Sequence, residues 1–224
     1  MSAATATVPR PGEPLVFIVD DDAGLRASLC SLLRSCGFQT ADYASGAEFL
    51  AASLPDNPRC LLLDVRLQGA SGLDFQAELG RRRIDLPIVF MTGHGDIPMT
   101  VRAMKAGAVD FLAKPFREQD LLDAVAAALA RDNERRASSR AAGELAARYA
   151  GLTPREREIM GLAASGLMNK QIAGQVGTSE ITVKIHRANA MRKMQAKTFA
   201  DLVRMAEALG LNVAEARPGS YTRV

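Results

Sequence analysis

The sequence is poor in the features that mark secreted, disulfide-linked and membrane proteins. None of its apolar runs approaches the roughly 20 residues that a transmembrane helix needs. The first fourteen residues lack the basic start and the apolar centre of a signal peptide. The three cysteines, Cys30, Cys36 and Cys60, form no C-x-x-C pair and are odd in number, which favours reduced, mostly buried thiols. We therefore expect a cytoplasmic globular protein.

Histidine is also scarce, and the charge is unevenly distributed along the chain. Two histidines in 224 residues cannot form a histidine metal cluster, and no Ser-His-Asp or Cys-His order suggests a hydrolase. Residues 1–131 hold 13 Lys and Arg against 16 Asp and Glu, a net charge of −3. Residues 132–224 hold 15 against 9, a net charge of +6. This asymmetry is expected if only the second part approaches a polyanion.

The first 130 residues alternate short apolar runs with longer amphipathic stretches. Continuous apolar runs are typical of strands that are covered on both faces, so the pattern predicts a doubly wound, five-stranded parallel sheet flanked by helices. The apolar residues from Leu25 to Leu33 and from Leu121 to Leu129 have helical spacing. The expected strands are LVFIV at 15–19, a weaker strand at 38–43, CLLLD at 60–64, PIVFMT at 87–92 and VDFLA at 109–113.

The remainder of the chain shows only helical spacing. We expect a flexible N-terminus over 1–13, a first domain over 14–131, a linker over 132–147 that could be helical, a small all-α domain over 148–212 and a flexible tail over 213–224. Glycines at 166, 177 and 210 separate the expected helices. These four helices span 154–165, 169–176, 179–194 and 198–209.

Polar side chains follow the predicted strands where the strands end. Three aspartates, Asp20 to Asp22, follow the first strand, and Asp64 ends the third. Thr92 ends the fourth strand and Lys114 follows the fifth, so these groups meet at one edge of a parallel sheet. Clustered carboxylates with room for water favour Mg²⁺, and a carboxylate beside Mg²⁺ can attack a phosphoryl group. An Asp run after a strand can also be only a turn and a helix N-cap.

Four segments in order favour the functional interpretation. FIVDDD, LLLDVRL, FMTGHGD and AVDFLAKPF resemble the signature segments of response-regulator receivers over about residues 14–131, which implies a flavodoxin-like fold. By this resemblance Asp64 is the phosphoacceptor, and Asp21 and Asp64 ligate Mg²⁺ with the Arg66 carbonyl while Asp20 helps through water. Lys114 would pair with the phosphoryl oxygens, and the Lys114–Pro115 bond is expected to be cis.

The resemblance also implies a switch. Phosphate on Asp64 would draw in the Thr92 hydroxyl, and the Phe111 ring would follow into the vacated space. One feature departs from the family: Leu67-Gln68 follows the phosphoacceptor where Met-Pro is usual, which puts the phosphoryl lifetime in doubt. Gln68 also keeps open the alternative of a DNA-binding protein whose receiver no longer switches.

The second basic part carries its own resemblance. LTPREREIMGLAASGLMNKQIA and TVKIHRANAMRKM resemble the LuxR-type helix-turn-helix of the FixJ/NarL class, over about residues 148–210. In the third helix an inner stripe is expected to pack in the core, with Val183, Arg187, Ala190, Met191 and Met194. The resemblance places Lys184, Ile185 and Ala188 on DNA bases and Lys170, Thr178, Arg187 and Lys193 near phosphates. Glu156 is expected to pair internally.

Together these resemblances imply a two-component response regulator. A sensor histidine kinase would phosphorylate Asp64, and the face formed by helix 97–106 and strand 109–111 would then dimerise and place two recognition helices on promoter DNA. RNA polymerase is a further expected partner. A phosphohydrolase is the rival interpretation, but the Asp-x-Asp-Gly-Thr of the haloacid dehalogenase type is missing from DDDAG. We expect only Mg²⁺-dependent self-phosphorylation and slow dephosphorylation.

Overall fold

The computed structural model describes residues 12–67, 70–93 and 97–211 and divides the chain into two compact units, Met1–Arg136 and Ala137–Val224. Helix α5, Glu118–Ala150, begins in the first unit and ends in the second. Within the described residues no helix is both long enough and apolar enough to cross a membrane.

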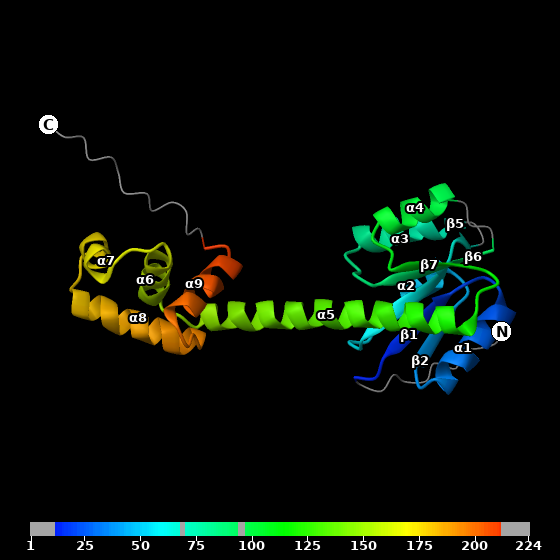
Figure 1. The fold of residues 1–224 in the computed structure, drawn as a ribbon, viewed down its shortest axis with the longest axis horizontal. Helices are drawn as coiled ribbons and strands as arrows, with labels where there is room; N and C mark the ends of the chain where they lie inside the picture. Colours follow the sequence, from blue (N-terminus) through cyan, green and yellow to red (C-terminus); the bar gives the residue numbers. More distant parts are fainter. Residues whose placement is uncertain (1–11, 68–69, 94–96, 212–224) are drawn as a thin grey trace. The chain divides into compact units, whose positions relative to one another are not determined.

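The first unit is built on a five-stranded parallel sheet (Figure 1). Its strand order is β2-β1-β3-β6-β7, so the order reverses between β1 and β3, and ligands of such sheets bind at the carboxyl ends of the strands at this reversal. The predicted fold class is confirmed. The antiparallel pair formed by β4 (Arg66–Leu67) and β5 (Ala70–Ser71) was not predicted. The sheet strands are β1 (Leu15–Val19), β2 (Gln39–Tyr43), β3 (Arg59–Asp64), β6 (Ile88–Thr92) and β7 (Asp110–Ala113).

Both faces of the sheet are covered. Alternate residues of β1 enter two separate cores: Phe17 and Val19 lie in one, while Val16 and Ile18 lie in the other. The first core contains residues of α2, α3 and α4, and the second contains residues of α1 and α5. This double cover explains why the strands read as continuous apolar runs. The helices are α1 (Ala23–Ser35), α2 (Gly46–Ala51), α3 (Gly72–Arg81) and α4 (Ile97–Lys105).

Several boundaries differ from the predicted ones by a residue. The helix expected over 97–106 ends at Lys105, and the strand expected from 109 begins at Asp110. The segment 132–147, expected as a linker, is continuous helix within α5, and the first compact unit reaches Arg136. Residues 1–11 and 213–224, expected to be flexible, lie outside the described part of the chain. Cys30 and Cys60 are buried and Cys36 is exposed, all three as free thiols.

Gly72 is required where α3 passes behind the end of β3. A Cβ atom at this position would overlap the carbonyl oxygen of Asp64, and the Gly72 N–H donates to the Val65 carbonyl at 2.8 Å. We expect Gly72→Ala to lower the free energy of unfolding by about 2 kcal/mol, because backbone must shift to make room. Gly80→Ala in the same helix is the matched control, since open space surrounds its Cβ position. Urea denaturation of both variants tests this; equal stabilities would contradict it.

The second unit is a bundle of short helices around the end of α5. These helices are α6 (Pro154–Ala164), α7 (Asn169–Val176), α8 (Glu180–Met194) and α9 (Phe199–Ala208). Thr153, Ser179 and Thr198 cap the starts of α6, α8 and α9 with their side chains, which is why the predicted starts lie within a residue of the observed ones. Gly177, at φ 64°, ends α7 in the left-handed conformation, and the short turn to α8 completes a helix-turn-helix.

Candidate functional site

Three carboxylates gather at the carboxyl edge of the sheet. Asp20 and Asp21 follow β1, and Asp64 is the last residue of β3. The two strands are parallel neighbours, with Val19 opposite Leu63, so their ends coincide. Each of the three residues offers a carboxylate oxygen within 4.8 Å of those of the other two. Asp20 and Asp64 are buried, whereas Asp21 reaches the solvent.

Lys114 joins two of these carboxylates. Its Nζ atom lies 2.7 Å from Asp20 Oδ2 and 3.3 Å from Asp64 Oδ1. The backbone N–H of Lys114 donates to the Thr92 carbonyl at 2.6 Å, which fixes the segment after β7 beside the end of β6. Thr92 is fully buried there, and the Lys114–Pro115 peptide is cis, as expected. The structure therefore brings Asp20, Asp64, Thr92 and Lys114 to one place from four separate segments.

The local environment distinguishes the carboxyl groups. Burial raises the pKa of Asp64 above its ordinary value, against the opposing effect of the Lys114 ammonium, and the Asp20 carboxylate raises it further. The pKa of Asp22 is lowered, because its side chain accepts the N–H groups of Leu25 and Gly24. Asp22 is thus the N-cap of α1, so one member of the Asp run has the structural role of a cap.

The donor set suits a hard divalent cation. Asp20, Asp21 and Asp64 supply oxygens of the kind that Mg²⁺ prefers. Arg66, whose carbonyl was predicted as a further ligand, is exposed and begins β4 two residues after Asp64. The residues present therefore fit the ion that receiver domains generally bind.

The sequence analysis missed one residue that shapes this site. Arg26 of α1 donates from Nη1 to the Asp20 carbonyl at 2.7 Å and from Nε to Asp42 of β2 at 3.3 Å. Arg26 thereby connects residues 20–22, which we call the acidic loop, to strand β2. The only signal was an arginine one turn into the helix that follows the aspartates, and that spacing is common in helices with no such role.

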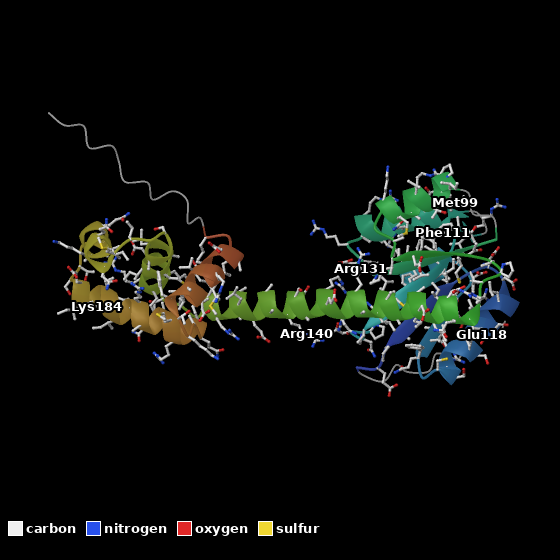
Figure 2. The ribbon with its side chains drawn as sticks, in the orientation of Figure 1. Met99, Phe111, Glu118, Arg131, Arg140 and Lys184 are labelled. Atoms are coloured by element: carbon white, nitrogen blue, oxygen red, sulfur yellow. The ribbon has the colours of Figure 1, made fainter. Side chains whose placement is uncertain are left out.

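The predicted switch residues lie on neighbouring strands. Thr92 ends β6, and Phe111 lies near the start of β7, half-buried, with its ring centroid 6.3 Å from that of Phe90. Figure 2 shows Phe111 close to Met99 of α4, and both pack against the same core. Of the unusual pair after the phosphoacceptor, Leu67 is buried, and Gln68 lies outside the described residues.

Helix α8 presents two different faces. Three of the five residues predicted for the inner stripe, Val183, Ala190 and Met194, are fully buried, while Arg187 and Met191 are partly buried. The side chains predicted to face bases, Lys184, Ile185 and Ala188, are exposed on the other face, and Lys184 lies near the start of the helix (Figure 2). A helix anchored on one side and exposed on the other is the arrangement that a major groove can accept.

The four residues predicted near phosphates differ in their surroundings. Lys170 is exposed and Thr178 is partly buried before α8. The Arg187 guanidinium stacks on the Phe199 ring at 4.0 Å and donates to Asn169 Oδ1 at 3.2 Å. Arg187 therefore also holds α8 against its neighbours.

Lys193, the fourth, pairs with the buried Glu156 at 2.7 Å, which confirms the predicted internal role of Glu156. The hydrogen bond from Lys193 lowers the pKa of Glu156. The ion pair therefore stabilises the fold at pH values above the pKa that Glu156 has in the unfolded chain, and this stabilisation is lost as the pH falls through the pKa of Glu156 in the folded protein.

We expect Glu156→Gln to lower the free energy of unfolding by about 1 kcal/mol at neutral pH. The difference from wild type should shrink in acid, measured by urea denaturation at several pH values. Glu158→Gln, in an exposed pair on the same helix, is the control; a deficit that persists in acid would refute the assignment.

Comparison with known proteins agrees with the two sites. Residues 16–126 match the family of response regulator receiver domains, and residues 150–206 match the luxR family of bacterial regulatory proteins. The class of protein is therefore a receiver joined to a DNA-binding helix-turn-helix. Relatives and solved structures that match most of the chain define the family within this class.

Nodulation protein W of Bradyrhizobium diazoefficiens is 55% identical over 198 residues, which are 88% of this chain and 87% of the relative. The transcriptional regulatory protein FixJ of Azorhizobium caulinodans is 43% identical over 89% of this chain and 95% of the relative. The structure of the response regulator StyR matches with a TM-score of 0.78 and 47% identity over 88% of this chain and 99% of that one. The chain belongs to the two-component response regulators of the FixJ/NarL class. It is a phosphorylation-controlled transcription factor and not a classical enzyme.

Proposed function

We propose that a sensor histidine kinase transfers its phosphoryl group to Asp64. The observation that carries this proposal is Lys114 Nζ, held between the Asp20 and Asp64 carboxylates. An Asp64 oxygen would form the new O–P bond while the N–P bond of the kinase phosphohistidine breaks and its ring nitrogen takes up a proton. Lys114 would then pair with a phosphoryl oxygen, which compensates the charge gained.

Asp20, Asp21, Asp64 and the Arg66 carbonyl would hold Mg²⁺, with Asp20 acting through water. When bound, the ion supplies positive charge that offsets the phosphoryl oxygens. The Lys114 ammonium, 3.3 Å from Asp64 Oδ1, would add a further positive charge beside the same carboxylate. The chain would phosphorylate itself from small donors and dephosphorylate slowly, with no external substrate turned over.

We propose that Thr92 and Phe111 transmit the modification. The Thr92 hydroxyl would turn toward the new phosphoryl oxygens, and the half-buried Phe111 ring would move inward behind it. Phe111 packs near α4, so its movement would be felt at that helix. We also propose that the receiver domain spans 14–131 and the DNA-binding domain spans 148–212, with residues 132–147 as the linker between them.

The face of α4 and β7 is the proposed dimer interface. Ile97, Val101 and Met104 follow helical spacing and are 81%, 43% and 43% exposed, an apolar stripe that a second copy could cover. We expect Val101→Glu to leave the phosphorylated protein monomeric in sedimentation velocity, because a dimer would bury the glutamate charge without a partner. Arg102→Glu, one residue along the same helix, is the matched control. A dimer of unchanged strength in Val101→Glu would exclude this face.

We propose that the second unit binds promoter DNA in the cytoplasm and contacts RNA polymerase there. Lys184, Ile185 and Ala188 would reach base edges. Phosphates would be met by Lys170, Thr178, Arg187 and Lys193, and the last two would do so from side chains that also hold the helix in place.

The proposal is tested by incubating the full chain with Mg²⁺ and a small phosphodonor. Intact mass would show one phosphoryl adduct, and DNA binding at fixed salt would become tighter. Firm binding without any adduct would instead favour a constitutive DNA-binding protein, the alternative that Gln68 raised. Absence of both adduct and binding would contradict the proposed function.

A further inference from the structure

The outward face of α8 carries an apolar stripe that the predicted DNA contacts do not explain in full. Ile181 is 70% exposed and Ile185 is 56% exposed, one helical turn apart. Ala188, exposed as well, continues the same face. Val183, two residues from Ile181 and so nearly opposite on the helix, is fully buried. The stripe therefore faces away from the core of the second unit.

The position of Ile181 is unusual for an apolar side chain that contacts only solvent. It lies in the first turn of α8, directly after the Ser179 cap and Glu180. In a helix-turn-helix the N-terminal residues of the recognition helix reach base edges. Helix propensity does not explain the isoleucine either, because alanine or glutamate would stabilise an exposed first turn more than a β-branched residue does.

The charge of the helix favours a polyanion as the partner of this face. Helix α8 carries four basic side chains, Lys184, Arg187, Arg192 and Lys193, and one acidic side chain, Glu180. This balance complements a polyanion and not an apolar protein groove. Among the base edges of the major groove, the thymine C5-methyl is the apolar group that an isoleucine can contact.

We infer that Ile181, together with Ile185, reads thymine methyl groups and so sets the sequence preference of this regulator. The inference rests on the proposed DNA-binding function and deepens it. Each half-site would contain thymines at fixed positions opposite the first two turns of α8. Lys184, between the two isoleucines, would add a polar contact beside them.

The experiment begins by selecting duplexes from a random pool with the phosphorylated full chain, because the target site need not be known. Each thymine of the selected site is then replaced by deoxyuridine, which lacks only the C5-methyl group. We expect about fourfold weaker binding at one or two positions in each half-site, the factor for one buried methyl group. In Ile181→Ala the penalty for deoxyuridine should vanish at one of these positions and persist at the position read by Ile185.

Met168→Ala is the matched control, because Met168 is 67% exposed but precedes α7 and does not belong to α8. It should retain every deoxyuridine penalty of the wild type. Penalties that are the same in Ile181→Ala and wild type, or a selected half-site without thymine, would overturn the inference while leaving DNA binding intact. Methyl-independent binding with transcription lost in Ile181→Ala would assign the face to RNA polymerase. A chain that selects no duplex at all would instead overturn the proposed function.

Discussion

Asp64→Asn is expected to abolish the phosphoryl adduct and, with it, the gain in DNA binding caused by a phosphodonor. The amide has nearly the shape of the carboxylate but no nucleophilic oxygen anion, so no O–P bond forms. The variant also removes one of the two negative charges beside Lys114, while the 2.7 Å pair with Asp20 remains. The fold should therefore persist. Intact mass and DNA binding at fixed salt, measured side by side with wild type, test the loss.

Asp22→Asn is the matched control for this experiment. Asp22 lies two residues beyond Asp20, yet its side chain caps α1, a role that asparagine performs equally well. We expect it to accept the phosphoryl group as wild type does. An adduct that survives in Asp64→Asn, or that is lost in Asp22→Asn, would place the phosphoacceptor elsewhere in the acidic loop.

The largest expected effect on stability lies at the other end of β3. Asp132 of α5 is completely buried and accepts the N–H of Arg59, the first residue of the strand that ends at Asp64, at 3.0 Å. The Arg135 guanidinium donates to the same carboxylate at 2.7 Å. Arg136 lies beside it and donates to Asp56 at 2.6 Å, which fastens the loop before β3 to α5. These hydrogen bonds and ion pairs take the place of the water that a buried carboxylate has lost, so the loss of one member leaves the others without compensation.

Asp132→Ala is expected to lower the free energy of unfolding of the first unit by about 3 kcal/mol, because it leaves the backbone N–H of Arg59 without its acceptor and removes the buried negative charge beside Arg135 and Arg136. Urea denaturation followed by circular dichroism measures the change. Asp120→Ala, also in α5, breaks an exposed pair with Arg117 and should change stability far less. Similar losses for the two variants would mean that the buried cluster contributes no more than a surface pair.

Local sequence determined most of the secondary structure. The central strands β1, β3 and β6 could be predicted from apolar runs because burial on both faces requires apolar residues at nearly every position. The edge strand β2, with the sequence QTADY, gave a weaker signal because it is only partly buried. The helix starts at Pro154 and near Ser179 could be predicted because capping is a local hydrogen bond between a side chain and the next turn. The pair β4 and β5 could not be predicted, since two-residue strands carry no periodicity.

The sequence by itself determined which chemical groups stand at strand ends, and so it named Asp20, Asp64, Thr92 and Lys114 as one site. Tertiary structure alone decided how those groups divide their roles. It placed Arg26 against the Asp20 carbonyl and the guanidinium of Arg187 on an aromatic ring. It also buried Asp132 in a segment that reads as a polar linker. The physical reason is that strand ends and caps follow from the local order of residues, whereas the partner of a charged side chain depends on which distant segment packs beside it.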